Sequence, residues 1–221
     1  GLDRVPEVKT LREKLGILCA EPERPRAWSS TLARDRMEAT PESAGTLYID
    51  GHVRVYHGAL TRLPRRYVSR ERLCLRGTTD YWVNAMDGQP FFVVTRPVDD
   101  GLLSVLKEEI VPRLQTEVPG QPGAEELAAD PLQHRFTIVF DREGYSPKFF
   151  AAMREKRIAV LTYHKFPGAD WGLEEFSARS VRLVNAEEVT LQLAERGVRL
   201  SNGLWVREVR HRDVRGHQTA I

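Results

Sequence analysis

Two aspartates stand directly after short apolar runs, a position from which a carboxylate can enter a metal site. Asp50 follows the run LYI, and Asp141 follows the run TIVF about 90 residues later. Ligand sites in open α/β sheets lie beyond the carboxyl ends of parallel strands. If the two runs form adjacent parallel strands, the carboxylates lie close together, and their like charges need a cation or a shared proton between them. The spacing therefore favours a metal or proton site at one end of a sheet.

The stretch LYIDGHVRVYHG, residues 47–58, also has a purely structural interpretation. An Asp-Gly pair between alternating apolar and polar residues is a strong signal for a β-hairpin turn. Asp50 would then serve only the turn at Gly51. His52 would share a face with Asp50 on a continuing strand, where it is either a transition-metal ligand or, more commonly, a structural histidine. These alternatives stay open at the level of the local pattern.

Composition limits the class of protein. The chain of 221 residues fits one large domain, or one domain with an inserted subdomain. Its 41% hydrophobic and 29% charged residues are typical of globular proteins, and no run of 18 apolar residues is present. The start of the sequence lacks the apolar region of a signal peptide, and Cys19 and Cys74 stand alone in unrelated contexts. We therefore expect a reducing, cytoplasmic environment.

Arginine dominates the basic residues, with 27 Arg and 6 Lys, although the net charge is only +2. Six arginines lie in residues 60–77 against one acid, and four lie in residues 205–217 beside two histidines. Arginine suits bidentate phosphate contacts, so these segments indicate a polyanionic partner. The alternative is a pair of solvated surfaces in a protein whose GC-rich gene raises the arginine content everywhere.

The hydrophobic pattern predicts an α/β domain between a helical start and an all-β tail. We expect helices over residues 5–20, 29–40, 101–118 and 146–157. We expect strands over residues 46–50, 53–57, 81–86, 90–95, 134–141 and 158–164, with an irregular stretch at 58–72. The tail alternates without helical periodicity, with hairpin turns at AERG and SNG. The expected units are a helical lead-in, a core and a β-rich insertion, over residues 1–44, 45–170 and 171–221.

This succession of elements predicts the fold class. Three antiparallel strands, a helix, a strand, a helix and a strand follow one another, as in a ribonuclease-H-like core. In such a core the first and fourth strands lie side by side and parallel, which brings Asp50 and Asp141 together. We predict an α/β fold with a ribonuclease-H-like mixed sheet, flanking helices and an all-β insertion at the C-terminal end.

The segments that carry the two acids resemble those of bacterial insertion-sequence transposases with a DDE-type, ribonuclease-H-like catalytic domain. The resemblance lies in LYIDGHVRVYHG, VFDREGYSPKFF and IAVLTYHKF, and further in RLCLRGTTDYWVNAMDGQPFFVV and GLWVREVRHRDVRGHQTAI. It covers nearly the whole chain. It implies that Asp50 and Asp141 are catalytic ligands of two Mg²⁺ or Mn²⁺ ions, which support phosphodiester cleavage and strand transfer.

The resemblance also implies partners and a location. The partner is DNA, as element ends and target, with a homodimer as one expected assembly, no membrane contact, and a place at the nucleoid of a bacterial cytoplasm. The residues expected to bind DNA are Arg62, Arg65, Arg66, Arg70, Arg72, Tyr163, Lys165, Arg207, Arg210 and Arg212.

One feature departs from the family pattern. The family's third acid is a Glu on a helix after the β-rich insertion, and this sequence stops at QTAI before such a helix. Glu208 is the local candidate for that role, and its alternative is an Arg-paired surface acid. On this ground we expect the chain by itself to be nearly inactive. The alternative function is a catalytically inactive, transposase-derived remnant that binds DNA or another partner.

Overall fold

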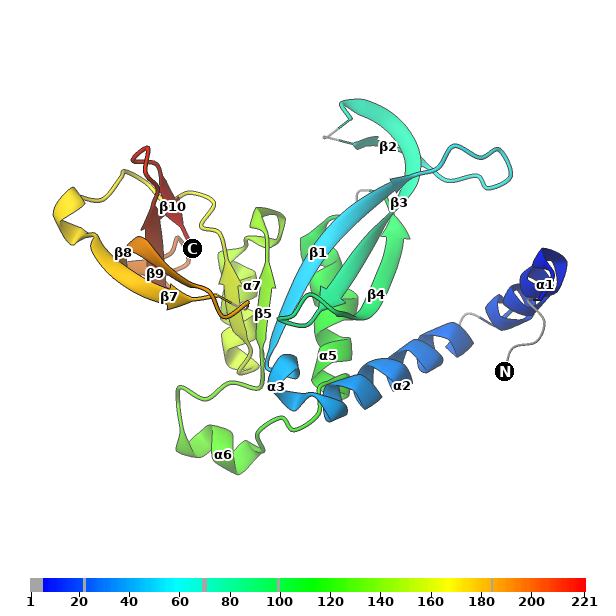
Figure 1. The fold of residues 1–221 in the computed structure, drawn as a ribbon, viewed down its shortest axis with the longest axis horizontal. Coiled ribbons are helices and arrows are strands. Elements are labelled where there is room, and N and C mark those ends of the chain that lie inside the picture. Colours follow the sequence, from blue (N-terminus) through cyan, green and yellow to red (C-terminus); the bar gives the residue numbers. More distant parts are fainter. Residues whose placement is uncertain (1–5, 22, 69–70, 99, 184) are drawn as a thin grey trace.

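The computed structural model describes residues 6–21, 23–68, 71–98, 100–183 and 185–221. Two sheets form the structure, and helices surround the first of them (Figure 1). The helices are α1 Val8–Cys19, α2 Glu23–Ala39, α3 Pro41–Ala44, α4 Leu102–Val105, α5 Val111–Glu117, α6 Ala124–Ala129 and α7 Pro147–Glu155. The strands are β1 Thr46–Val55, β2 Arg65–Val68, β3 Leu73–Asn84, β4 Pro90–Pro97, β5 Thr137–Phe140, β6 Ala159–Thr162, β7 Ser177–Arg182, β8 Glu188–Arg199, β9 Trp205–Arg212 and β10 Gln218–Ala220.

The first sheet, which we call the core sheet, is mixed. β3 pairs antiparallel with β4 on one side and with β1 on the other, and β1, β5 and β6 follow as parallel neighbours. The prediction that the strand before Asp50 and the strand before Asp141 are adjacent and parallel is confirmed by β1 and β5. The start of β3 extends past β1 and pairs with β2, which forms a two-stranded ribbon.

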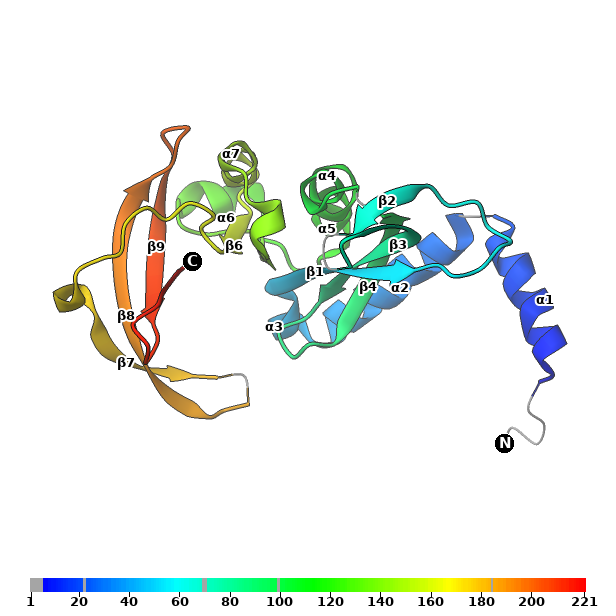
Figure 2. The same ribbon diagram turned by 90° about the horizontal axis from the view of Figure 1, so that it is seen from above.

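The two faces of the core sheet have different environments. Leu47 and Ile49 of β1 are buried, while Tyr48 and Asp50 between and after them are exposed. β5 repeats the alternation with buried Ile138. Helices α5 and α7 add buried residues to the same apolar cluster, and Figure 2 shows both on one side of the sheet. We call the opposite side the open face; its members include Tyr48, Asp50, His52, Arg54 and Trp82.

The second sheet, which we call the tail sheet, is antiparallel with the order β10-β9-β8-β7. An all-β tail was predicted, and the SNG turn is confirmed by Gly203, whose φ of 84° suits only glycine without strain. The AERG turn is wrong, because Ala194–Gly197 lies inside the long strand β8, paired with β9. Continuous pairing of this segment with β9 outweighs the local turn preference of Glu-Arg-Gly.

Two helices also differ from their predictions. α2 begins at Glu23 and not at residue 29, because Pro25 falls in the first turn, where the missing N–H has no helical partner in any case. The helix expected over 101–118 is continuous from α4 to α5, but a π-helical turn at Leu106–Ile110 separates them. Pro112 lies two residues after this turn, and a proline that cannot complete the normal helical hydrogen bond explains the widened turn. None of the helices in the described ranges is long and apolar enough to cross a membrane.

Candidate functional site

The pairing of β1 with β5 sets the two predicted aspartates side by side. Ile49 pairs with Phe140, and this is the last pair of the parallel ladder. Asp50 and Asp141 are the next residues along each strand. Because side chains alternate between the faces of a sheet, both aspartates follow buried residues and face the open side. The sequence predicted that both acids lie at strand ends. In the structure Asp141 follows the end of β5, whereas Asp50 follows the end of the pairing with β5 but lies within β1, which continues to Val55.

Asp50 and Gly51 form no turn. Asp50 pairs with Trp82 of β3, and Gly51 pairs with Tyr81. The hairpin interpretation is therefore wrong, as is the prediction of two short strands at this point. A Cβ atom at Gly51 would lie 3.1 Å from the Tyr81 ring, so the glycine is explained by close packing within a strand.

Each carboxylate has one oxygen engaged by the backbone. Oδ1 of Asp50 accepts a hydrogen bond from the N–H of Gly51 at 2.9 Å. Oδ1 of Asp141 accepts one from the N–H of Glu143 at 2.9 Å, where Asp141 caps a short 3₁₀ turn. Among the described residues, the second oxygen of each carboxylate has no hydrogen-bond partner. Both side chains are exposed, so these oxygens are accessible to a ligand.

Two aromatic residues flank the pair of acids. Trp82 lies opposite Asp50 and is 37% exposed. On the other side, Thr162 of β6 donates from Oγ1 to the carbonyl of Asp141 at 3.0 Å, so the next residue, Tyr163, lies beside Asp141. The guanidinium of Arg142 lies 5.6 Å from the Tyr163 ring centroid. Lys165 is exposed two residues further, beyond the end of β6.

His52 lies next to a buried acid on the open face. It pairs across the strands with Asp80, whose residue exposure is 4%. Asp80 accepts a hydrogen bond from Thr95 Oγ1 at 2.8 Å and forms an ion pair with Arg54 Nε at 2.6 Å. Asp80 is therefore already neutralised. In the described ranges, no group of three or more His, Cys, Asp or Glu side chains is arranged to hold a metal ion, so the transition-metal role of His52 gains no support.

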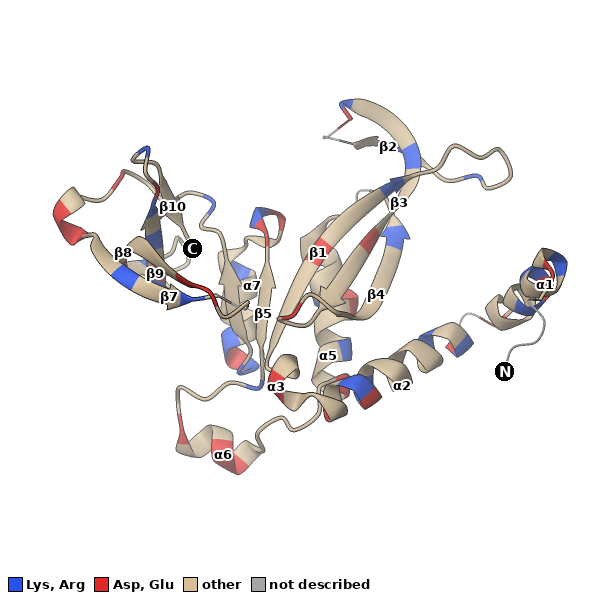
Figure 3. Ribbon diagram, in the orientation of Figure 1, with Lys and Arg blue, Asp and Glu red and all other residues tan. Residues whose placement is uncertain are grey.

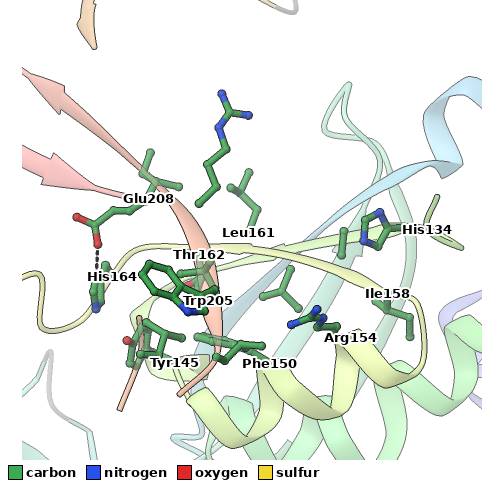
Figure 4. Close-up of a pocket in the computed structure, with 17 residues that line it drawn as sticks. His134, Tyr145, Phe150, Arg154, Ile158, Leu161, Thr162, His164, Trp205 and Glu208 are labelled. Carbon is green, nitrogen blue, oxygen red and sulfur yellow. Dashed lines mark hydrogen bonds and ion pairs between the residues drawn. The ribbon is translucent and has the colours of Figure 1, made fainter. Parts of the chain in front are cut away.

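Both oxygens of Glu208, the candidate third acid, are occupied. Oε1 accepts from Arg210 Nε at 2.7 Å, and Oε2 pairs with Nδ1 of His164 (Figure 4). The side chain is 2% exposed, so Glu208 is Arg-paired, as its alternative interpretation stated, but buried. The Tyr145 ring stacks on His164 with the centroids 5.4 Å apart. Burial, and after it the charge of Glu208, raises the pKa of the Tyr145 hydroxyl.

This buried cluster borders a cavity between the core sheet and the tail sheet. The cavity has a volume of about 270 Å³ and a mostly apolar lining from α7, β6 and β9. Figure 4 shows Trp205 and Glu208 of β9 on one side and Phe150 of α7 on another. No sequence pattern predicted the pair of His164 and Glu208, because 44 residues separate them and no motif links them.

The arginines of the first basic segment lie on and around the β2–β3 ribbon. Figure 3 shows basic residues along this ribbon, at the end of the core sheet away from α3. The exposed members are Arg62, Arg65, Arg66, Arg72 and Arg76. Within the described part of the chain, none of them forms an ion pair. Arg70 lies outside the described residues.

The tail arginines have different surroundings. Arg207 pairs with Glu195 on the neighbouring strand. Arg210 is 2% exposed, donates to two backbone carbonyls and lies with its guanidinium 4.3 Å from the Trp171 ring centroid. Arg212 is partly buried. Arg210 therefore holds the tail together and presents no surface to a partner, unlike the ribbon arginines.

Comparison with known proteins places this arrangement in a family. No curated protein matches the chain. A family model with the description "Transposase protein" matches residues 1–221, which is the whole of the chain. The match includes both aspartate-bearing strands, the arginine-rich ribbon and the tail sheet. The chain therefore belongs to the Transposase_29 family of transposase proteins.

Proposed function

We propose that this chain is the catalytic core of a DNA transposase that cleaves phosphodiester bonds and transfers strands with divalent metal ions. Membership of a transposase family supports the general role and implies DNA as the partner. The observation that carries the finer proposal is the register of β1 and β5, since it sets Asp50 and Asp141 next to each other on the open face.

The strand order supports a ribonuclease-H-like assignment. β4, β3, β1, β5 and β6 follow one another across the core sheet, with β1 parallel to β5 and β5 parallel to β6. α5 precedes β5 and α7 joins β5 to β6, so both parallel connections contain a helix. This is the succession that the sequence predicted for such a core, and it gives the two acids the relation that a shared site requires.

The donor set fits Mg²⁺ or Mn²⁺. Two carboxylates side by side supply hard oxygen ligands and two negative charges, and each retains an oxygen without a hydrogen-bond partner in the described residues. Asp50 and Asp141 would be the residues that hold such ions. Bound ions of this kind stabilise the attacking and leaving oxygens of a phosphodiester. The chain's own residues orient the carboxylates through the backbone N–H groups of Gly51 and Glu143.

Glu208, the candidate third acid, is held in buried pairs that disfavour a role as a metal ligand. Glu208 would have to release both Arg210 and His164 before its oxygens reached a metal ion. Breaking a buried pair leaves an uncompensated charge, so this exchange is costly. We therefore assign the metal site to Asp50 and Asp141. Glu208 should be tested as a ligand only after these two residues.

Metal binding and DNA nicking test the proposal together. Mn²⁺ binding to the chain is measured by calorimetry, and nicking is measured on supercoiled plasmid with Mg²⁺ or Mn²⁺. We expect Asp50→Asn and Asp141→Asn to abolish Mn²⁺ binding, because each removes one of two charged ligands. Asp87→Asn is the control, since Asp87 is an exposed acid in the β3–β4 hairpin that asparagine also suits. Equal Mn²⁺ affinity in all four proteins would overturn the metal site.

The second candidate function is DNA binding without cleavage. The observation that favours it is that the described residues contain no third acid grouped with Asp50 and Asp141, whereas the ribbon offers unpaired arginines. A chain that binds duplex DNA, and whose Asp50→Asn and Asp141→Asn variants bind Mn²⁺ no differently from the wild type, would support this function over the catalytic one.

A further inference from the structure

The β2–β3 ribbon carries its arginines on two opposite faces. Arg65 pairs with Arg76 across the ribbon, and Tyr67 pairs with Cys74 two positions further along. These four residues share one face, because side chains alternate along each strand. All four are exposed, and Tyr67 is 53% exposed. Arg66 is adjacent in sequence but belongs to the other face, where Val68 is buried.

The first of these ribbon faces continues directly into the open face of the core sheet. β3 is one uninterrupted strand from Leu73 to Asn84. Its alternate residues therefore run along a single face from Cys74 and Arg76 to Asp80 and Trp82. Trp82 is the residue that pairs with Asp50. One strand face thus joins the ribbon arginines to the proposed metal site.

The charges along this face are those that a phosphate backbone would require. Arg65 and Arg76 stand directly opposite each other, and like charges in that relation repel. Neither has an acidic partner among the described residues, so an external anion is the natural counter-charge. The one acid between them and Trp82 is Asp80, and Arg54 with Thr95 neutralises it. No free negative charge of β3 therefore stands between the arginine pair and the metal site.

We infer that this face, comprising Arg65, Tyr67, Cys74, Arg76, Arg54 and Trp82, is a track along which the DNA backbone runs to Asp50 and Asp141. The inference rests on the proposed function and names the surface that function would use. Arg76 lies six residues before Trp82 on β3, which corresponds to about 20 Å. Duplex DNA rises about 3.4 Å per base pair, so the arginine pair contacts phosphates roughly six base pairs from the bond at the metal site.

Neighbouring arginines on opposite ribbon faces provide a matched test. Binding of a 30-base-pair duplex is measured by fluorescence anisotropy at several salt concentrations, for the wild type and for Arg65→Ala, Arg76→Ala and Arg66→Ala. We expect Arg65→Ala and Arg76→Ala each to weaken binding about five- to tenfold at 0.1 M salt and to reduce the salt slope by about 1. Arg66→Ala removes the same charge from the opposite face of the ribbon and should weaken binding clearly less than either of them. Equal losses for Arg65→Ala and Arg66→Ala would overturn the track.

Cys74 gives a second readout that does not depend on affinity. A photoreactive group attached to Cys74 in a Cys19→Ser background should crosslink to the duplex. The same group at residue 75, in a chain with Cys74→Ser and Leu75→Cys, should crosslink much less because residue 75 lies on the other face. Equal crosslinking from both positions would contradict the track. Mn²⁺ binding is measured separately, so loss of the metal site alone would refute the catalytic proposal while leaving the track intact as a DNA surface.

Discussion

The core sheet and the tail sheet are stabilised by different interactions. The core sheet rests on one large apolar cluster that includes fully buried residues of β1, β5, α5 and α7. Of the described tail residues, Leu200 is the buried member of this cluster, and Leu204 and Val206 pack against it. The tail sheet depends more on exposed ion pairs that link a strand to a neighbouring strand or connection, such as Arg196 with Glu175 and Arg207 with Glu195. Apolar burial does not depend on the ionisation of acidic side chains, whereas exposed ion pairs are weakened both by salt and by acid. The proposed metal site therefore lies on the core sheet, whose stability should depend little on pH. The neighbouring tail sheet should be more sensitive to salt and pH.

The largest effect should come from breaking the buried pair in the tail. Glu208→Ala leaves the Arg210 guanidinium buried without its carboxylate, and such a loss typically costs about 3–5 kcal/mol. We expect the tail to unfold at a lower urea concentration than the core, as followed by tryptophan fluorescence. Glu195→Ala removes an exposed partner of Arg207 and serves as the control, with little change expected. If both variants unfolded like the wild type, Glu208 would not hold the tail in place.

A substitution that creates a cavity in the core should lower the free energy of unfolding by nearly as much, but it should affect the whole chain and not the tail alone. Ile138 on β5 is fully buried, and Ile138→Ala should lower the free energy of unfolding by about 2–5 kcal/mol. Because the core supports both sheets, urea unfolding monitored by circular dichroism should shift as a whole. Leu193→Ala, at a half-buried position of β8, should shift the transition less. An equal shift for the two variants would show that apolar burial contributes as much to the stability of the tail sheet as to that of the core sheet.

Some features of the core sheet could be predicted from the sequence and others could not. The adjacency of β1 and β5 could be predicted because the succession of strands and helices is that of a ribonuclease-H-like core, in which the strands that carry these two acids are parallel neighbours. The continuity of β1 through Asp50 and Gly51 could not be predicted, since the local preference for a turn is outweighed by pairing with β3. Whether the two acids bind metal stays a prediction, because their positions are structural facts and their role is not.

The ribbon arginines and the buried pairs of the tail depend on contacts between distant residues, which leave no local sequence pattern. Residues 58–72 were expected to be irregular, but Arg65–Val68 forms β2. The opposition of Arg65 and Arg76 was therefore not predicted; it arises from the extension of β3 beyond β1. The partners of Glu208 were equally hidden, since one of them comes from the end of β6. Arg210 was expected on the surface because charge patterns cannot distinguish an exposed arginine from one that carbonyls and an aromatic ring enclose.

A smaller effect should reveal how the two regions are joined. The Asn202 side chain, in the turn between β8 and β9, donates from Nδ2 to the carbonyl of Pro147 at 2.8 Å. Asn202→Ala should weaken the attachment of the tail by about 0.5–1.5 kcal/mol. Hydrogen exchange of the β9 amides should speed up accordingly. Asn185→Ala, in the β7–β8 hairpin, removes a contact within the tail only, and faster β9 exchange in that variant too would argue against a specific junction at Asn202.

The smallest expected effect concerns acid. Hydrogen bonds from Arg196 and Arg207 lower the pKa of Glu175 and of Glu195, respectively, below the ordinary value of 4.5. A lowered folded-state pKa gives stability that is complete above the unfolded pKa and is lost as the pH falls through the folded pKa. The tail should therefore loosen below about pH 4.5 before the core does. Trp171 fluorescence against pH, compared with circular dichroism, measures this order, and simultaneous transitions would contradict it.

The parallel pairing of β1 with β5 also has a consequence for synthesis on the ribosome. β1 ends at Val55 and β5 begins at Thr137, about 80 residues later. At bacterial and eukaryotic elongation rates, β1 waits about 4 to 16 seconds for its neighbour. β3, the antiparallel partner of β1, emerges before β5 and can pair with β1 through contacts that are closer in the sequence and form faster. β4 follows and pairs with β3. A nascent chain stalled before residue 137 would therefore present the bare edge of β1 to strands of other chains.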